Sequence, residues 1–312
     1  MSVRGSALRT VWDPAGPDGL PFGSNSMQHG TAVFEGIRCY PTAQGPAIFR
    51  LDDHLRRLLG SAHQLGIPHD YDLPRLRERV LAAADTGGSD ESYLRPVLYT
   101  PDSQLGVDLG RFRFVLAVEV YSMAPADTGT GALPPGVRLT VSPWRRPAAT
   151  SFPPQVKATG TYAVSALART AAAARGFDDA IQLDPVSGRV AESTVANVFL
   201  VRGGRLLTPW LSDSLLAGIT RDTVLVLARQ LGIDVAEGPV ELTDLYQAQE
   251  VFLTGTAAEL VPATEIDGHG TDPRGPVFRA VAEAFRDAVR GRRFRDLGWL
   301  TRTSEPHQAA RI

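Results

Sequence analysis

A segment rich in Pro, Gly, Thr and Ala, Ala124–Gly136, divides this chain of 312 residues into two halves. The segment lacks the apolar periodicity of a buried helix or strand. At about 150 residues per domain, a chain of this length fits two domains. The sequence therefore predicts a small N-terminal domain over residues 1–123, a linker over 124–136, a large domain over 137–300 and a flexible polar tail over 301–312.

The first half reads as strands, then helices, then strands again. Residues 32–40 and 45–50 are predicted to form paired strands around a Pro- and Gly-containing turn. Leu51, Leu55, Leu58, Ala62 and Leu65 form one apolar helical stripe, with acidic residues favouring the start of that helix. A second helix is predicted over Leu73–Ala84, followed by strands over 93–100 and 111–123.

The second half combines short strands with longer helices, so the whole chain is predicted to have an α+β fold with two domains. One helix is predicted to open at Thr220 as its N-cap and to close at Gly232. The predicted strands cover 137–143, 179–184, 189–192, 197–201, 204–209 and 250–257, and the helices cover 162–176, 218–233 and 276–290.

Composition excludes several classes of protein. A formal net charge of -2 and a pI near 6.3 give no electrostatic reason to bind nucleic acid or an anionic membrane. The lone Cys39 excludes an intramolecular disulfide, and no apolar run approaches the roughly 20 residues of a membrane span. The histidines show no metal-binding spacing, and no dinucleotide or ATP motif is present. We expect a cytoplasmic protein without a metal.

Only one of the 32 basic residues is a lysine, Lys157. Arginine supplies surface charge as well as lysine does, but it cannot replace an amine that must lose its proton and attack a carbonyl. The count alone leaves two interpretations open, a chemical role and the chance survival of a surface lysine. The surroundings favour chemistry, because Lys157 lies in PPQVKATGTYA, between a proline pair and a turn that opens a helix.

Several short segments together resemble one known family. They are GTAVFEGIRCY, IFRLDDHLRRL, YLRPV, VKATGTYA, ANVFLV, LLTP, LLAGITRD and EVFLTGTAAE, in this order from about Gly30 to Leu300. In order and spacing they resemble the class IV pyridoxal phosphate-dependent aminotransferases, and within them the branched-chain amino acid aminotransferases. The resemblance implies a two-domain fold with pyridoxal 5'-phosphate at the domain interface, and homodimers whose active sites lie at the subunit interface.

The resemblance also implies roles around the cofactor ring. Lys157 would bind the cofactor aldehyde covalently and then act as the general base on the substrate α-proton. Glu192 would pair with the pyridine nitrogen, Tyr162 would hydrogen-bond the phenolic oxygen, and Leu216 would pack on the ring. Read without the resemblance, Glu192 is a solvated strand end, Tyr162 a packed helix tyrosine and Leu216 a core leucine.

A second group of residues is implied in binding the phosphate. Arg50 offers a bidentate guanidinium. Ile219 and Thr220 lie at a predicted helix N-terminus, where backbone N–H groups and the helix dipole favour an anion. Thr256 adds a hydroxyl and the amides of a turn. Taken alone, the motif GIT, which contains Ile219 and Thr220, indicates only a helix cap, and the motif TGTA, which contains Thr256, indicates only a turn.

The substrate pocket is implied to draw on both halves of the chain. The pocket residues from the first half would be Phe34, Arg38, Tyr93 and Arg95, with Arg95 serving the distal carboxylate of glutamate. The amides of Thr256 and Ala257 would hold the α-carboxylate. Val107, in the loop after the 93–100 strand, would reach the partner subunit's site. The alternative interpretation is that Phe34 and Tyr93 are core aromatic residues and that Arg38 and Arg95 are surface residues of strands.

The chain departs from its relatives at three places. His29 stands where branched-chain enzymes commonly carry a tyrosine in the pocket wall. Ser193, Thr194 and Val195 replace a Gly-rich stretch after Glu192, and Thr161 replaces a common asparagine. These changes indicate either relaxed substrate preference or an unusual amino acid substrate.

The predicted function is transamination between an L-amino acid and 2-oxoglutarate or glutamate, in amino acid biosynthesis. The amino acid is predicted to be branched-chain or otherwise apolar, including precursors of specialised metabolites. The alternatives are a D-amino acid aminotransferase or an aminodeoxychorismate lyase of the same fold, and a catalytically silent binding protein. Retention of Lys157, Glu192 and Arg50 argues against the last, because a silent scaffold needs no such lysine.

Overall fold

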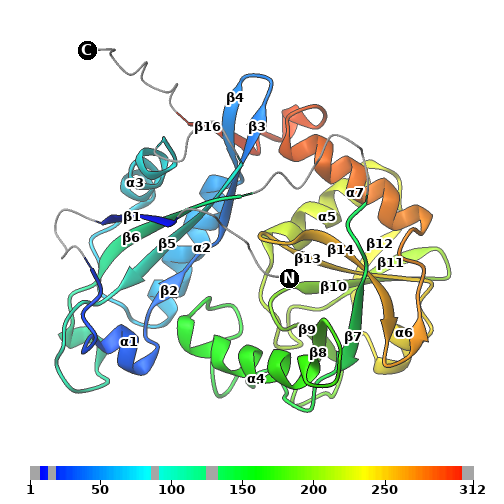
Figure 1. The fold of residues 1–312 in the computed structure, drawn as a ribbon, viewed down its shortest axis with the longest axis horizontal. Helices are drawn as coiled ribbons and strands as arrows, with labels where there is room; N and C mark the ends of the chain where they lie inside the picture. Colours follow the sequence, from blue (N-terminus) through cyan, green and yellow to red (C-terminus); the bar gives the residue numbers. More distant parts are fainter. Residues whose placement is uncertain (1–7, 13–18, 86–90, 124–132, 304–312) are drawn as a thin grey trace. The chain divides into compact units, whose positions relative to one another are not determined.

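The computed structural model describes residues 8–12, 19–85, 91–123 and 133–303. Two sheets, each with its own helices, form an α+β fold with two compact units, which confirms the predicted fold class (Figure 1). The predicted linker lies largely outside the described residues.

The two units do not follow a single division of the chain. The seven-stranded unit comprises Ser2–Thr128, Val156–Gly160 and Asp287–Ile312, and the nine-stranded unit comprises Gly129–Gln155 and Thr161–Arg286. Lys157 therefore belongs to the seven-stranded unit, although the residues on either side of its segment belong to the other. The domain boundaries drawn from sequence stay a prediction.

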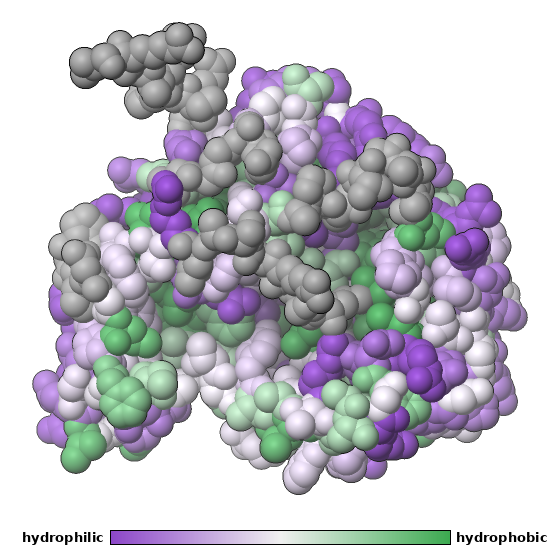
Figure 2. Space-filling model, viewed as in Figure 1, coloured by the Kyte–Doolittle hydropathy of each residue, from purple (hydrophilic) through white to green (hydrophobic). Residues whose placement is uncertain are grey.

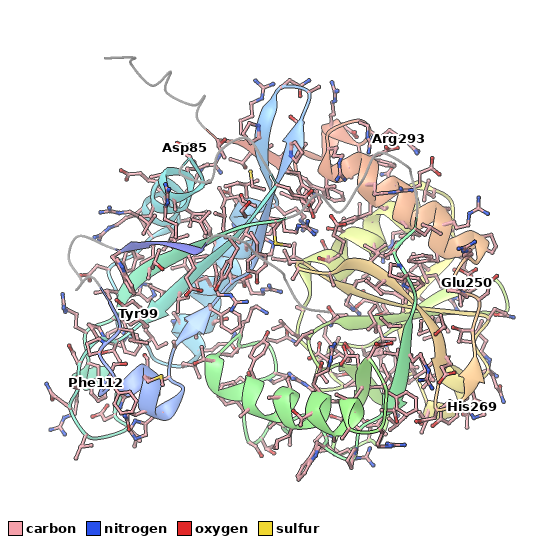
Figure 3. All side chains as sticks on the ribbon, in the orientation of Figure 1. Asp85, Tyr99, Phe112, Glu250, His269 and Arg293 are labelled. Atoms are coloured by element: carbon pink, nitrogen blue, oxygen red, sulfur yellow. The ribbon has the colours of Figure 1, made fainter. Side chains whose placement is uncertain are left out.

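The seven-stranded sheet has the strand order β1-β6-β5-β3-β4-β16, with β2 paired to β5. Its paired strands are antiparallel, and the predicted hairpin is confirmed by the pairing of Cys39 in β3 with Ile48 in β4. Tyr99, labelled in Figure 3, ends β5, and its ring lies edge-on to Trp12 at 6.0 Å. The strands are β1 (Leu8–Trp12), β2 (Val33–Phe34), β3 (Ile37–Thr42), β4 (Gly45–Phe49), β5 (Ser92–Tyr99), β6 (Val115–Ser122) and β16 (Leu300–Arg302).

The helices of this unit are α1 (Asn25–His29), α2 (Leu51–Gln64) and α3 (Leu73–Asp85). The predicted apolar stripe of α2 is confirmed, because Leu51, Leu55, Leu58 and Ala62 are buried, and Leu65 follows the helix as its C-cap. Burial of these side chains supplies the hydrophobic free energy that holds the helix on the sheet.

A buried ionic cluster fixes α2 to the turn after β2. Glu35 is fully buried and accepts hydrogen bonds from Arg57 Nε at 2.6 Å, Arg57 Nη2 at 2.8 Å and His54 Nδ1 at 2.8 Å. Burial alone would raise the pKa of Glu35, but the charge and hydrogen bonds of Arg57, with a smaller contribution from His54, hold that pKa well below its usual range. Burial lowers the pKa of His54. The cluster is therefore a carboxylate paired with an arginine and a neutral imidazole.

The nine-stranded sheet has the order β12-β11-β10-β13-β14-β7-β8-β9, with β15 paired to β14. It is mixed, since β11 and β12, β14 and β7, and β7 and β8 run parallel. Its strands are β7 (Val137–Val141), β8 (Asp179–Leu183), β9 (Val190–Ser193), β10 (Asn197–Arg202), β11 (Arg205–Pro209), β12 (Val235–Gly238), β13 (Glu250–Gly255), β14 (Glu259–Ile266) and β15 (His269–Gly270).

Four helices accompany this sheet: α4 (Tyr162–Ala173), α5 (Ile219–Gln230), α6 (Leu242–Tyr246) and α7 (Pro276–Val289). The alanines of α4 pack closely on β8, where Ala168 and Ala172 meet Ala180. Glu250, labelled in Figure 3, caps α7 by accepting hydrogen bonds from the backbone of Val277 and Phe278. A carboxylate at this end complements the helix dipole.

One local prediction was wrong. Gly218, not Thr220, is the N-cap of α5, because Gly218 has an extended backbone (φ -70°, ψ 131°) and the helix already begins at Ile219. A Cβ at position 218 would lie 1.9 Å from Asn197 Oδ1, so only glycine fits there. Leu300–Arg302, at the start of the predicted tail, forms β16 and pairs with β4 at the sheet edge. An edge strand offers unpaired backbone groups that such a segment satisfies. Residues 304–312 lie outside the described part.

Within the described residues, no helix is long and apolar enough to cross a membrane. The same residues contain no group of three or more His, Cys, Asp and Glu side chains placed to hold a metal ion.

Candidate active site

Lys157 is held by its backbone on the edge of β2. Its N–H donates to Ser61 Oγ of α2 at 3.1 Å, and its carbonyl accepts from Phe34 N at 3.0 Å. Ala158 forms a β-bridge with Val33, so the segment runs as a short antiparallel addition to the strand. The side chain of Lys157 therefore starts from a backbone fixed on two sides.

A pair of glycines allows this segment to approach the residues before β2. Gly160 N donates to Gly30 O at 3.0 Å, and a Cβ added to Gly30 would lie 2.8 Å from the Cα of Gly160. Gly30 also has φ +67, which side chains rarely tolerate. The close approach explains the glycine in the ATGT turn after Lys157.

Four of the predicted site residues form one cluster. Lys157 Nζ lies 4.9 Å and the Arg95 guanidinium 5.2 Å from the centre of the Phe34 ring. Arg95 Nη2 donates to the hydroxyl of Tyr93 at 3.2 Å. Phe34 and Tyr93 are buried, whereas Lys157 and Arg95 are partly exposed. The cluster offers an amine and a guanidinium beside an apolar wall.

Strand β6 adds two residues to this cluster that sequence analysis missed. Tyr121 lies edge-on to Tyr93 at 6.0 Å and donates to Glu119 at 3.0 Å. Burial alone would lower the pKa of Arg95, but the neighbouring hydroxyl of Tyr93, with Tyr121 and Glu119, raises it. Burial raises the pKa of Tyr121, and Glu119 adds to this shift. The sequence signal that could have identified them is the alternation of side-chain direction along a strand, which places Glu119 and Tyr121 on one face of β6.

Three other predicted pocket residues have different surroundings. Arg38 pairs with Tyr93 in the strand register, yet its buried guanidinium forms an ion pair with Glu91. His29 is exposed at the end of α1, and its Nδ1 lies 3.2 Å from the amide nitrogen of Asn25. Val107 is exposed in the loop before Asp108. Their roles in substrate binding stay predictions.

In the nine-stranded unit, Glu192 is the centre of a polar network. It lies in β9 and is buried, and its Oε2 accepts from Asn197 Nδ2 at 2.9 Å and from Leu216 N at 3.3 Å. Its Oε1 lies 3.2 Å from Arg146 Nη2. Arg146 in turn donates from Nε to the carbonyl of Ser214. Glu192 is therefore a fixed carboxylate, not the solvated strand end of the alternative interpretation.

Asn197 brings the other predicted residues of this unit together. Its amide donates to the carbonyl of Leu216, and its Oδ1 lies against Gly218, the residue before Ile219 and Thr220. Asn197 is also paired with Thr254 across β10 and β13. Thr256 and Ala257 follow at the end of β13. The start of α5 and the end of β13 are thus both anchored beside Glu192.

Tyr162 and Arg50 are the remaining predicted cofactor residues. Tyr162 begins α4 and is half-buried, and its assignment to the cofactor's phenolic oxygen stays a prediction. Arg50 lies between β4 and α2, where its Nε donates to Asp53 Oδ2 at 2.7 Å. Sequence analysis missed Arg146, Asn197 and Ser61, which hold the predicted residues; Asn197 stood in the quoted motif ANVFLV without a role.

Replacing Gly218 by alanine should weaken cofactor binding. The added Cβ would displace Asn197 and, with it, the hydrogen bonds to Glu192 and Leu216, at a cost of about 1–3 kcal/mol. Titration of the protein with pyridoxal phosphate, the cofactor that the motifs predict, measures this loss as about a tenfold rise in Kd. Gly238→Ala is the matched control, since no atom lies within 4 Å of a Cβ there. Equal affinity of both variants would contradict the prediction.

Comparison with known proteins shows the class to which this fold and site belong. The family model "Amino-transferase class IV" matches residues 32–266. The chain therefore belongs to the class IV aminotransferases, which are pyridoxal phosphate-dependent enzymes, as its sequence motifs predicted.

The relatives belong to one branch of that family. The branched-chain-amino-acid aminotransferase of Escherichia coli (strain K12) is 35% identical over 284 residues, which cover 90% of this chain and 92% of that protein. A branched-chain aminotransferase structure from Thermoproteus uzoniensis with norvaline is 38% identical, with a TM-score of 0.85, covering 91% and 94% of the two chains. The T.th. branched-chain amino acid aminotransferase with pyridoxamine 5'-phosphate is 35% identical, with a TM-score of 0.87, covering 97% and 100%.

The residues described above fit pyridoxal phosphate. The chain's only lysine has a fixed backbone, as an amine that must reach an aldehyde requires. Glu192 is a buried carboxylate, the partner that a protonated pyridine nitrogen needs. The N-terminus of α5, a helix of 12 residues, suits a phosphate.

Proposed function

We propose that this enzyme transfers the amino group of a branched-chain L-amino acid to 2-oxoglutarate, with glutamate as the product. The observation that carries this proposal is the cluster of Lys157, Phe34, Tyr93 and Arg95, which joins an amine to an aromatic wall and a guanidinium. An apolar substrate side chain suits the rings, and a second carboxylate suits Arg95.

Two observations support a pocket for both kinds of substrate. Arg95 Nε is buried and has no hydrogen-bond partner among the described residues, so a ligand carboxylate would satisfy it. The similar T.th. enzyme was solved in complex with N-(5'-phosphopyridoxyl)-L-glutamate and with 4-methylvaleric acid. One of those ligands carries a second carboxylate and the other a branched apolar chain.

The proposal assigns each residue a task. Bound pyridoxal phosphate supplies an electron sink for the carbanion at the substrate α-carbon. Lys157 Nζ takes the proton from that carbon and returns it when the second substrate reacts. Glu192, held by Asn197, Leu216 and Arg146, would accept a hydrogen bond from the ring nitrogen and keep it protonated. Arg50 and the N-terminus of α5 would bind the phosphate, and the amides of Thr256 and Ala257 would bind the substrate α-carboxylate.

Incubation with L-leucine and 2-oxoglutarate tests the proposal, because glutamate must form. Arg95→Gln should raise the KM for 2-oxoglutarate about tenfold or more, while the KM for 4-methyl-2-oxopentanoate, which has no second carboxylate, stays unchanged. Absence of glutamate with leucine, isoleucine and valine would overturn the substrate assignment and favour the lyase or D-amino acid alternatives.

We also propose that the enzyme acts as a homodimer. Exposed apolar side chains gather near α1 and in the loop after β5, where Phe22, Met27, Leu105 and Val107 are more than half exposed. The green surface over the α1 region in Figure 2 belongs to this part of the chain. Burial against a second copy would remove this apolar area from water. Light scattering of wild type and Val107→Asp tests the assembly, with a monomeric variant as the expected result.

A further inference from the structure

Arg50 has a backbone conformation that few residues with a side chain adopt. It lies at the junction of β4 and α2, with φ 53° and ψ 40°, in the left-handed region. Such a conformation persists only where surrounding contacts determine it. The contacts around Arg50 therefore show what sets the direction of its guanidinium.

Trp299 contacts both the backbone and the side chain of Arg50. Arg50 N donates to the carbonyl of Trp299 at 2.6 Å, and the guanidinium carbon lies 5.2 Å from the centre of the Trp299 ring. The ring itself is held edge-on by Phe49, with centroids 5.6 Å apart. The two contacts reach Arg50 from a residue 249 positions later in the chain.

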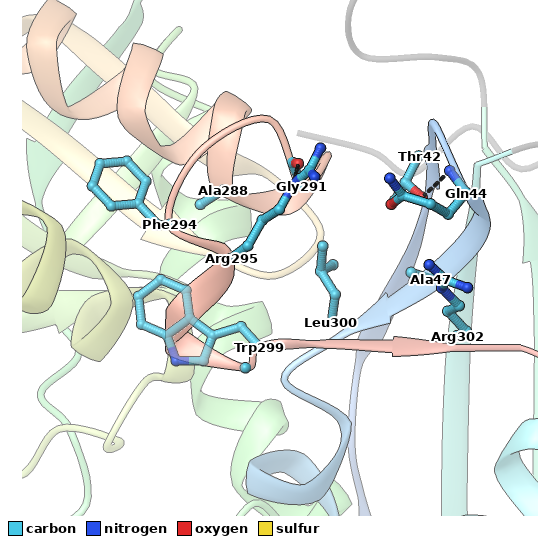
Figure 4. Close-up of a pocket in the computed structure, with 11 residues that line it drawn as sticks. Thr42, Gln44, Ala47, Ala288, Gly291, Phe294, Arg295, Trp299, Leu300 and Arg302 are labelled. Atoms are coloured by element: carbon cyan, nitrogen blue, oxygen red, sulfur yellow. Dashed lines mark hydrogen bonds between the residues drawn. The ribbon is translucent and has the colours of Figure 1, made fainter.

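The C-terminal strand explains how Trp299 reaches this position. Strand β16 pairs with β4 in the register Leu300 to Phe49, which places the preceding residue beside the start of α2. Figure 4 shows Trp299 directly before this strand, in a pocket that it lines with Phe294 and Arg295. The ring is half-buried, so it has a defined place in the fold.

Asp53 is a second residue that orients the Arg50 guanidinium. Its Oδ2 accepts from Arg50 Nε at 2.7 Å, from the first turn of α2. The guanidinium of Arg50 is therefore restrained on two sides, by the ring over which its carbon lies and by the carboxylate that accepts from its Nε. A preset orientation reduces the entropy lost when the group binds an anion.

We propose that Trp299 is a positioning residue for cofactor binding, because it presets the Arg50 guanidinium to receive the phosphate of pyridoxal phosphate. This inference rests on the proposed role of Arg50. It gives the C-terminal strand a function in the site, although the strand itself need not touch the cofactor. A role in phosphate recognition can be distinguished from a role in stability by comparing pyridoxal phosphate with pyridoxal. Pyridoxal lacks the phosphate, so its binding should not depend on the orientation of Arg50.

The test compares the affinity of the apoenzyme for pyridoxal phosphate and for pyridoxal, each measured by absorbance titration. Trp299→Leu should weaken pyridoxal phosphate binding about 3- to 30-fold and leave pyridoxal binding unchanged, the range expected for a lost arginine–aromatic contact. Trp299→Phe keeps an aromatic face and should restore most of the affinity. Trp210→Leu, at an exposed tryptophan of the other unit, should change neither value.

Arg50→Gln separates this inference from the proposed function. If Arg50→Gln leaves the preference for pyridoxal phosphate over pyridoxal intact, the assigned role of Arg50 is wrong, and the inference falls with it. If Arg50→Gln lowers that preference but Trp299→Leu does not, only the inference is overturned. Equal losses of both affinities in Trp299→Leu, with no recovery in Trp299→Phe, would also overturn it, because they would show a purely structural role.

Discussion

Substitution of Lys157 by arginine is expected to lower the rate of transamination by about 10⁴-fold or more. Arginine keeps a cation near the Phe34 ring, where Lys157 Nζ lies 4.9 Å from the ring centre. Its guanidinium cannot lose a proton at neutral pH, so it can neither attack the cofactor aldehyde nor accept the substrate α-proton. The variant thus separates the charge of Lys157 from its chemistry.

The composition of the chain sharpens this experiment. Reduction with borohydride links the cofactor to the amine that holds it, and Lys157 supplies the only lysine amine. Mass spectrometry of the digested protein should find the label at position 157 in wild type and not in Lys157→Arg. A label at another position, or a variant that retains activity, would contradict the assignment. The rates of the two half-reactions, measured by stopped flow, should both fall in Lys157→Arg.

Replacement of Glu35 by glutamine should lower the free energy of unfolding by about 3–5 kcal/mol. An amide cannot accept the three hydrogen bonds that Arg57 and His54 donate to the carboxylate, and it leaves the Arg57 charge without its counter-ion in a largely buried place. Urea denaturation followed by circular dichroism measures the change. The loss also frees α2, which carries Ser61, the acceptor for the Lys157 N–H.

The control for this variant lies on the same helix. Asp52 pairs with Arg77 in a half-exposed salt bridge, and Asp52→Asn should cost no more than about 1 kcal/mol. Similar losses from the two variants would show that the Glu35 cluster behaves like a solvated pair.

The Glu35 effect should also depend on pH. The pKa of Glu35 is lowered in the folded state, so the unfolded chain binds its proton first as the pH falls. The stabilisation is fully present above the unfolded pKa of about 4.3 and declines at lower pH. The difference in unfolding free energy between wild type and Glu35→Gln should therefore shrink below about pH 4.3. A constant difference down to pH 3 would contradict the lowered pKa.

Local sequence patterns predicted much of this fold. The stripe of α2 was predictable because a helix repeats every 3.6 residues, and Leu51, Leu55 and Leu58 meet that spacing within one segment. The hairpin of β3 and β4 was predictable for a similar reason, since two apolar runs flank a short turn. The requirement for glycine at the N-cap of α5 was not, because it comes from the contact of Gly218 with Asn197, which is distant in the chain.

In the site, too, some residues were predictable from local sequence and others were not. Lys157 was identifiable because a single lysine among many arginines is a property of composition, the motif around Arg50 is a contiguous string, and Glu192 lies shortly before the motif ANVFLV. The residues that hold them were not identifiable. Ser61, Arg146 and Trp299 lie far from their partners in sequence, and no local pattern marks an acceptor, an ion pair or a stacked ring.

By itself, the sequence determined the class of enzyme, the α+β alternation of elements and the single amine able to bind an aldehyde, because composition, periodicity and short motifs are local properties. Only the tertiary structure decided that Lys157 belongs to the seven-stranded unit, that Leu300–Arg302 closes the edge of β4, and which side chains orient Arg50 and Glu192. Those outcomes depend on strand register and on contacts between distant segments, which a linear pattern does not encode.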